Sequence, residues 1–293
     1  MCSCTPACQF RRIVHRRTVP LPTLSIIALG DWPAERLHAS LGASGLRLDA
    51  DLLTTVNRVW ADALTQRGVN LFDGPLCRLE KLTVDHHGLH LNLSPTSYRI
   101  FIGTNGRHPH WADTHGRHVM ADAMGTSVAL RSSDGILVFG RRSQRVALYP
   151  GFAHPFGGTM EPSPDGAAID LLGEMRRELT EEVGITLNDL SDLRAIAVIE
   201  DRRLRQPELI YAAQTSLTAD AISRRLDLHE HTDCWLLADD RSDIEAALTR
   251  GEAITPVLAG TLLAWGWRRF GDNWLNAHLA CCQAERQGIA RWE

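Results

Sequence analysis

The stretch RRELTEEVGI, residues 176–185, gathers three glutamates within five positions and then reaches a glycine. It closes a segment whose apolar residues recur at helical spacing, so we predict one helix over roughly residues 165–183. Asp165 is the candidate N-cap, and Gly184 fits the left-handed position that follows a helix. The apolar face of the predicted helix consists of Leu171, Leu172, Met175, Leu179 and Val183.

A stripe of acidic residues lies beside this apolar face. Side chains three or four positions apart meet on a helix, and like charges there destabilise it by about 0.2–0.5 kcal/mol per pair. A divalent cation offsets that repulsion, and Mg²⁺ prefers carboxylate oxygen while sharing its shell with water and substrate phosphates. The sequence therefore predicts half of a metal site. The alternative is a solvated acidic face with Arg176 and Arg177 as neighbours. The stripe consists of Glu174, Glu178, Glu181 and Glu182.

The length and charge of the chain limit its functional class. Its 293 residues are enough for one large domain or two modest ones. The formal net charge is −4 and the basic residues form no long run, so we expect no nucleic-acid partner. The sequence also lacks an apolar run of about 18 residues, so we expect no membrane span.

The N-terminus, MCSCTPACQFRRIVHRR, lacks the apolar core of a secretory signal. Seven scattered cysteines are typical of reduced thiols, so we expect a cytoplasmic protein. Cys2, Cys4 and Cys8, together with His15, are candidate metal ligands. The favoured interpretation is instead a loosely ordered tail.

The rest of the chain predicts many strands with few helices between them. We predict a strand at 23–29, a helix at 49–68 that begins at Asp49 or Asp51 and ends at Gly68, and antiparallel strands within 77–105. A hairpin is predicted at 126–143, followed by the strands LRAIAVIED, PELIYAAQTSL and DCWLLA and by an apolar helix at 254–271. This order favours an α+β sandwich over a doubly wound sheet.

The acidic helix resembles the box of the Nudix hydrolases, which reads Gly-x5-Glu-x7-Arg-Glu-apolar-x-Glu-Glu-x-Gly-apolar. RELTEEVGI, residues 177–185, matches the second half of that motif completely. Upstream, Gly157, Gly158 and Glu161 in FGGTMEP resemble its start. The resemblance implies the Nudix α/β/α sandwich with a mixed sheet.

The middle of the box departs from the family pattern. About five extra residues separate GGTMEP from the helix, and Ile169 occupies the position of the first family glutamate. The role of that glutamate is therefore absent or is taken over by Glu161 or Glu174.

Further segments occur in the same order as in one Nudix branch. They are LFDGP (71–75), TSYRIFIGTN (96–105), WADT (111–114), ILVFGRRSQRVA (136–147), GGTMEP and SLT (216–218). They resemble the branch that hydrolyses UDP-glucose and UDP-galactose, which also has a long N-terminal region and an insertion in its box. Residues 1–20 are expected to form a flexible tail. The resemblance implies an N-terminal extension that contributes to the nucleotide pocket (21–115) and a Nudix hydrolase domain (116–293).

The resemblance also implies roles for the box residues. The box helix of the family binds Mg²⁺, for which Mn²⁺ can substitute, and water attacks one phosphorus of a diphosphate. Glu178 and Glu182 are the predicted metal ligands, and Glu181 either binds metal or positions the water. Arg177 is expected to orient a glutamate. Such chemistry requires positioning and charge neutralisation, and a metal lowers the pKa of bound water.

Three side chains outside the box are predicted to bind the substrate. Phe72 is a candidate to stack on the base, and the alternative is a core phenylalanine beside a turn. Tyr98 is a candidate nucleotide contact, or else an ordinary strand residue. Arg142 follows a strand and has the guanidinium geometry that suits a diphosphate, although it could instead form a solvated pair with Arg141.

The glycine loop and two later carboxylates complete the predicted site. His154 and Thr159 lie near Gly157 and Gly158, and Glu161 is expected to face the box helix. The candidate general bases are Glu208 and Glu230, and the alternative for each is an ordinary loop carboxylate.

The function that the resemblance implies is Mg²⁺-dependent hydrolysis of a small nucleoside diphosphate sugar. The favoured substrates are UDP-glucose and UDP-galactose, which would give UMP and the sugar 1-phosphate. One alternative is the same chemistry on ADP-ribose or a nucleoside triphosphate. Another is a non-catalytic sensor of nucleotide sugars, which Ile169 in a glutamate position allows.

Overall fold

The computed structural model describes residues 23–65, 71–163, 169–250, 252–282 and 284–286. Most strands belong to a nine-stranded mixed sheet with the order β11-β6-β5-β10-β9-β1-β12, in which β7 pairs with β6 and β8 with β5. These strands are β1 (Leu24–Trp32), β5 (Gly125–Arg131), β6 (Ile136–Arg142), β7 (Ala153–His154), β8 (Phe156–Thr159), β9 (Leu190–Asp201), β10 (Gln206–Thr215), β11 (His231–Ala238) and β12 (Ala284–Arg286).

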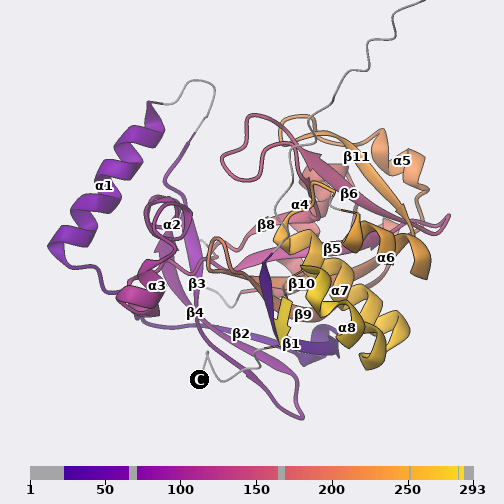
Figure 1. The fold of residues 1–293 in the computed structure, drawn as a ribbon, viewed down its shortest axis with the longest axis horizontal. Helices are drawn as coiled ribbons and strands as arrows, with labels where there is room; N and C mark the ends of the chain where they lie inside the picture. Colours follow the sequence, from indigo (N-terminus) through magenta and orange to yellow (C-terminus); the bar gives the residue numbers. More distant parts are fainter. Residues whose placement is uncertain (1–22, 66–70, 164–168, 251, 283, 287–293) are drawn as a thin grey trace, which may run out of the picture.

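A second sheet of three strands has the order β2-β4-β3, from β2 (Leu37–Leu41), β4 (Leu89–Ser97) and β3 (Pro75–Val84). Helix α1 (Ala50–Leu64), the short helices α2 (Tyr98–Phe101) and α3 (Trp111–Thr114), and a π-helical turn (Ile102–Gly106) lie at one end of this unit (Figure 1).

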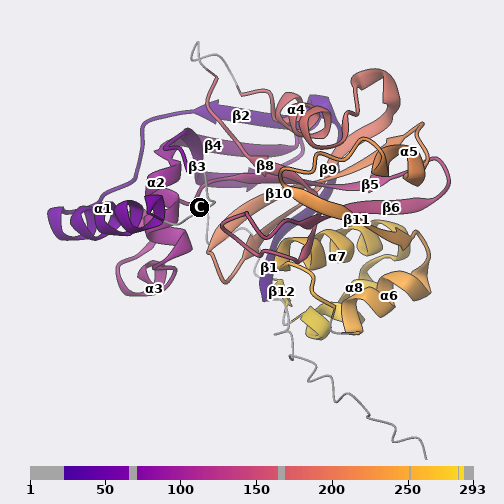
Figure 2. The same ribbon diagram turned by 90° about the horizontal axis from the view of Figure 1, so that it is seen from above.

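Helices cover both faces of the large sheet (Figure 2). The helices α6 (Arg241–Thr249), α7 (Pro256–Phe270) and α8 (Asp272–His278) pack on one face around a buried apolar cluster. On the other face lie the helices α4 (Leu171–Val183) and α5 (Ala219–Ser223), and the small sheet joins them in one apolar cluster. The fold is thus the predicted α+β sandwich, in which α4 is the acidic helix.

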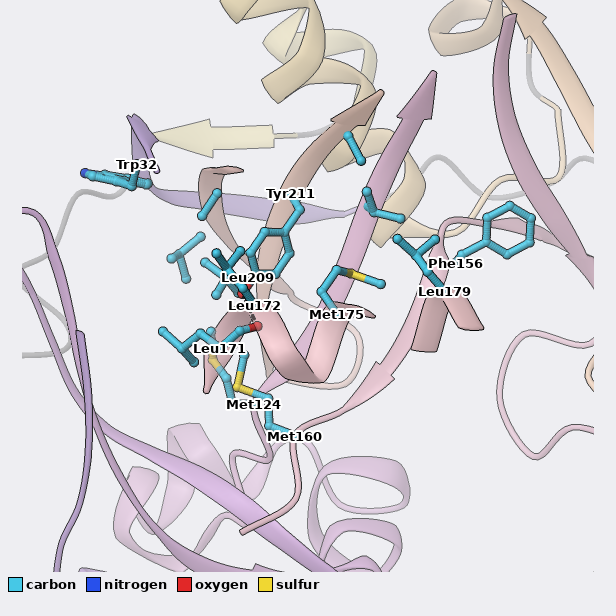
Figure 3. Close-up of a cluster of buried hydrophobic side chains, with 14 of the residues drawn as sticks. Trp32, Met124, Phe156, Met160, Leu171, Leu172, Met175, Leu179, Leu209 and Tyr211 are labelled. Carbon is cyan, nitrogen blue, oxygen red and sulfur yellow. Dashed lines mark hydrogen bonds between the residues drawn. The ribbon is translucent and has the colours of Figure 1, made fainter. Parts of the chain in front are cut away.

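The core beneath α4 fixes the position of that helix. Figure 3 shows Leu171 and Leu172 beside Leu209 and Tyr211 of β10, Met175 farther along the helix and Leu179 beside Phe156, and all of these side chains are buried. The Tyr211 hydroxyl donates to the Leu171 carbonyl at 2.7 Å, which ties the first turn of α4 to the sheet.

Two predicted boundaries are wrong. The acidic helix begins at Leu171 because the Asp170 carboxylate accepts from the Gly173 N–H at 2.9 Å. The predicted cap Asp165 lies outside the described residues. The segment after Ser97 is helical instead of extended, since the Ser97 hydroxyl caps Ile100 N–H at 3.5 Å and the apolar residues that follow recur at helical spacing.

Several other expectations hold, while some elements were not predicted. Asp49 caps α1 through Leu52 N–H at 2.8 Å, whereas the predicted end at Gly68 lies outside the described residues. The predicted metal ligands Cys2, Cys4, Cys8 and His15 also lie outside them. The elements that were not predicted are β2, β7, β8, β12, α3, α5, α6 and α8.

The division of the chain at about residue 115 stays a prediction. Strand β1, within the predicted extension, pairs antiparallel with β9 of the large sheet. Within the described part of the chain, no helix combines the length and apolarity that crossing a bilayer requires.

Candidate active site

A cavity of about 430 Å³ lies beside α4 and the ends of several strands. The box helix contributes Arg177, Glu178 and Glu181 to its wall, and β8 contributes three small residues. The remaining lining includes Leu76, Tyr98, Phe101, Arg142, Leu148, Tyr149, His154, Glu161, Asp201, Leu204, Gln206, Glu208 and Glu230. The cavity therefore brings together most of the predicted site residues.

Glu182 lies just behind this wall, with 5% of its surface exposed. The backbone N–H of Gly157 donates to its Oε2 at 2.7 Å, and His231 Nε2 lies 2.9 Å from its Oε1. Burial, followed by the nearby charge of Glu230, raises the pKa of the Glu182 carboxyl well above its ordinary value. Donor atoms of Glu182, Glu230 and His231 all lie within 4.8 Å of one another, which suits a metal ion.

Arg177 pairs with three glutamates of the same helix. Its guanidinium lies 2.7 Å from Glu178, 2.9 Å from Glu181 and 3.1 Å from Glu174. Burial nevertheless raises the pKa of Glu178 to about 8, and Arg177 offsets only part of that effect. The arrangement holds the acidic stripe together and leaves it with unfavourable negative charge, which a cation would stabilise.

Two glycines of β8 allow this carboxylate cluster to approach the sheet. Gly157 has a φ of +149°, and a Cβ there would overlap the Thr126 carbonyl. A Cβ on Gly158 would overlap the carboxylate of Glu178. Only glycine fits at these two positions without moving a neighbour.

Arg142 and Tyr98 line the cavity from outside the box helix. Arg142 Nε donates to the Leu148 carbonyl at 3.0 Å, so the loop that contains Leu148 orients the guanidinium. Burial lowers the pKa of Arg142, while Glu230 and Glu182 oppose that effect. Burial raises the pKa of the Tyr98 hydroxyl above its ordinary value.

Of the other predicted substrate contacts, three line the cavity and one does not. His154 lines the cavity with Nδ1 2.9 Å from the Thr255 hydroxyl, and burial and the charge of Arg142 lower its pKa. Thr159 and Glu161 also line it. Phe72 does not belong to the lining and is 76% exposed, so its base-stacking role stays a prediction.

The two candidate general bases occupy different environments. Glu208 is buried on β10 opposite Gly125, and its Oε1 accepts from the Ser127 hydroxyl at 2.5 Å. Burial raises the pKa of Glu208 to about 8. Glu230 is exposed at the cavity mouth, next to His231. Both are placed to reach the cavity, and their roles stay predictions.

Sequence reasoning missed a second polar group of the cavity wall. The Tyr149 hydroxyl donates to Asp201 Oδ2 at 2.6 Å, and both residues line the cavity. Burial raises the pKa of Asp201 to about 6. The only sequence signal was the pair Glu200-Asp201 at the end of an apolar strand, which is an unusual place for buried carboxylates. His231, which directly follows Glu230 in the sequence, was not predicted as a site residue either.

The chain is similar in sequence to known proteins. It is 33% identical over 240 residues to the human "uridine diphosphate glucose pyrophosphatase NUDT22", covering 69% of this chain and 78% of that protein. The Bos taurus protein of the same name is 32% identical over 196 residues, and the aligned region covers 55% of this chain and 67% of the Bos taurus protein. No family model matches the sequence. The solved structure of DR0079 from Deinococcus radiodurans is 22% identical in sequence, with a TM-score of 0.38. The aligned region covers 48% of this chain and 80% of the DR0079 chain.

Proposed function

This chain belongs to the Nudix hydrolase family, in the branch of the uridine diphosphate glucose pyrophosphatases, and from that premise we propose that it is a Mg²⁺-dependent pyrophosphohydrolase. The proposed substrates are UDP-glucose and UDP-galactose. Water breaks the phosphoric anhydride bond and gives UMP and the sugar 1-phosphate. The observation that carries the proposal is the clustering of buried, mutually repelling glutamates beside a cavity of about 430 Å³.

The donor set suits a divalent cation with oxygen ligands. Glu178 and Glu182 are the proposed ligands, with Glu181 as a further ligand or as the residue that positions water. Mg²⁺ fits this set because it is a hard ion, and Mn²⁺ can occupy a similar set. When bound, the metal supplies neutralisation of phosphate charge and a water molecule of lowered pKa.

The protein groups then have separate tasks. Arg177 holds the glutamates in place through three contacts between 2.7 and 3.1 Å. Arg142 is proposed to bind the diphosphate, and Tyr98 to contact the nucleotide. Glu208 is the favoured general base because burial raises its pKa to about 8, close to the pH at which a base works best. Glu230 is the second candidate.

A cytoplasmic location remains part of the proposal and is supported by the seven scattered cysteines. Two other functions are the alternatives to this proposal. One is the same hydrolysis of ADP-ribose or a nucleoside triphosphate. The other is binding of a nucleotide sugar without turnover, for which Ile169 in a family glutamate position is the motivating observation.

The test is a panel of UDP-glucose, UDP-galactose, ADP-ribose and a nucleoside triphosphate, assayed with and without Mg²⁺. We expect UMP release from the UDP-sugars only with metal, and near-complete loss of turnover in Glu182→Gln with folding retained by circular dichroism. Binding of UDP-glucose without any product from the panel would establish the sensor function instead. Unchanged turnover in Glu182→Gln would remove that residue from the mechanism.

A further inference from the structure

Asn105 connects two parts of the chain that are far apart in sequence. It lies in the π-helical turn Ile102–Gly106 and is fully buried. Its Nδ2 donates to the carbonyl of Leu204 at 2.9 Å and to that of Arg205 at 3.2 Å. Both carbonyls belong to the turn between β9 and β10, so the helical unit beside the small sheet contacts a hairpin of the large sheet.

The orientation of the Asn105 amide is fixed by its surroundings. Its Oδ1 accepts from the Asp122 backbone N–H at 3.1 Å, while the two carbonyls on the other side require a donor. Only one of the two amide orientations satisfies all three groups. Removing the amide would leave three buried backbone groups without this partner, which is costly in a site that excludes water.

Arg117 supports the same turn from a second direction. Its Nη2 donates to the Arg205 carbonyl at 3.0 Å. The guanidinium also pairs with Asp122 at 2.7 Å and with Glu200 at 2.6 Å, and both carboxylates are at most 1% exposed. Arg205 itself has a φ of +55°, a strained conformation that persists only where the surroundings impose it.

The supported turn forms part of the cavity wall. Leu204 lines the cavity, and so do Asp201 and Gln206 on either side of the turn. Asp201 Oδ1 accepts from the Arg203 and Leu204 N–H groups at 2.8 and 3.4 Å, so the conformation of the turn sets the orientation of this carboxylate. Asp201 Oδ2 in turn accepts from the Tyr149 hydroxyl at 2.6 Å.

We infer that Asn105 is a positioning residue for the substrate pocket. From outside the box it holds the β9–β10 turn, and the turn holds Asp201 and Tyr149 in the cavity wall. Its loss should weaken substrate binding more than the chemical step, because the box glutamates do not contact this network in the described structure. The turnover part of this inference rests on the proposed function.

The test compares Asn105→Ala with Ser132→Ala. Ser132 is buried in the turn between β5 and β6, away from the cavity, and its hydroxyl accepts from the Ile136 N–H at 3.0 Å. Both variants lose a buried hydrogen-bonding side chain, but only Asn105 contacts the β9–β10 turn. For Asn105→Ala we expect a rise of about tenfold in KM for UDP-glucose with a much smaller change in kcat. For Ser132→Ala we expect a lower Tm with KM unchanged.

A second readout does not depend on turnover. Hydrogen exchange of the Arg203 and Leu204 amides should accelerate in Asn105→Ala and stay at the wild-type rate in Ser132→Ala. If wild-type protein fails to hydrolyse UDP-glucose, the proposed function fails and the exchange comparison still tests the inference. A folded Asn105→Ala protein with unchanged exchange would overturn it, as would equal acceleration in both variants. Asn105→Asp adds a third variant, since it keeps the acceptor for Asp122 N–H and removes the donor.

Discussion

His231 Nε2 lies 2.9 Å from Glu182 Oε1, and both side chains are buried. Burial and the charge of Arg142 lower the pKa of His231 to about 4, so the ring is neutral near pH 7 and carries one N–H. Its Nδ1 has no hydrogen-bond partner within the described part of the chain, which places the proton on Nε2. The Gly157 N–H holds the other oxygen of Glu182 at 2.7 Å. The protein therefore fixes the orientation of this carboxylate before metal binds.

Replacing His231 by leucine should weaken metal binding. The side chain keeps much of its volume and loses the donor to Glu182, and loss of such a partner typically costs 10- to 100-fold in metal affinity or activity. Calorimetric titration with Mg²⁺ or Mn²⁺ measures the change. His229→Leu is the matched control, because His229 is exposed two residues away in the same loop. Equal affinities for the two variants would contradict the assigned role.

The contact between Gly158 and Glu178 gives a second prediction. A Cβ at Gly158 would overlap the Glu178 carboxylate, so Gly158→Ala should displace it from its metal-binding position. A misplacement of about 1 Å can cost on the order of 100-fold in rate, and we expect a fall in kcat of that order. In Gly42→Ala the nearest atom to the new Cβ is the Leu93 carbonyl oxygen at 3.9 Å, so this control should keep its activity. If Gly158→Ala turned over substrate at the wild-type rate, the close packing would have no catalytic importance.

The sequence predicted the acidic helix and its partners better than it predicted the cavity wall. The glutamates of α4 could be placed because helical spacing is local and RELTEEVGI is a specific motif. The start of that helix was misplaced because an aspartate can cap a helix at more than one point of this sequence, and the structure places the cap at Asp170.

Other features depend on contacts between distant segments. The pair Tyr149–Asp201 joins residues 52 positions apart, and Tyr149 has a φ of +51° that no local pattern indicates. Phe72 lies within LFDGP, a segment that resembles the related branch, yet its side chain is 76% exposed, because a sequence motif does not determine which way a side chain points. The short strands β7 and β8 form through pairing with β6 and β5, and so carry weak local signals.

Because Glu208 is buried, we expect the stability of the protein to fall as the pH rises. Burial raises its pKa from 4.5 to about 8 in the folded protein. Between those values the folded state holds a proton that the unfolded state has released, so raising the pH lowers the free energy of unfolding. The effect should reach at most a few kcal/mol above pH 8.

Glu208→Gln removes this titration while keeping an acceptor for the Ser127 hydroxyl. The variant should match wild-type stability near pH 5 and exceed it near pH 8.5, as measured by urea unfolding of metal-free protein. Glu35→Gln, at an exposed carboxylate, is the control that should follow the wild-type curve. If Glu208 is the general base, the stabilised Glu208→Gln protein should also have lost most of its turnover. A parallel pH dependence in wild type and variant would show that Glu208 does not titrate as its burial implies.

Metal binding should stabilise the protein, and more strongly as the pH rises. Burial raises the pKa of Glu178 to about 8, so protons and Mg²⁺ compete for the same carboxylate, and competition by protons weakens as the pH rises toward 8. A ligand that binds only the folded state adds about 2.7 kcal/mol when present at 100 times its Kd. Thermal unfolding at pH 6 and at pH 8, with EDTA or with saturating Mg²⁺, should therefore show a larger increase in Tm at pH 8.

The variant Glu182→Gln distinguishes stabilisation by metal bound at the buried glutamates from a general effect of added salt. It replaces a carboxyl whose charged form is disfavoured by burial and then by Glu230, so the metal-free protein should be at least as stable as wild type. It should also show little increase in Tm on adding Mg²⁺. Glu181→Gln is the graded comparison, because this glutamate is exposed and loses less repulsion on neutralisation. Equal stabilisation of wild type and Glu182→Gln by Mg²⁺ at both pH values would mean that the ion binds elsewhere and that the buried glutamates do not form the metal site.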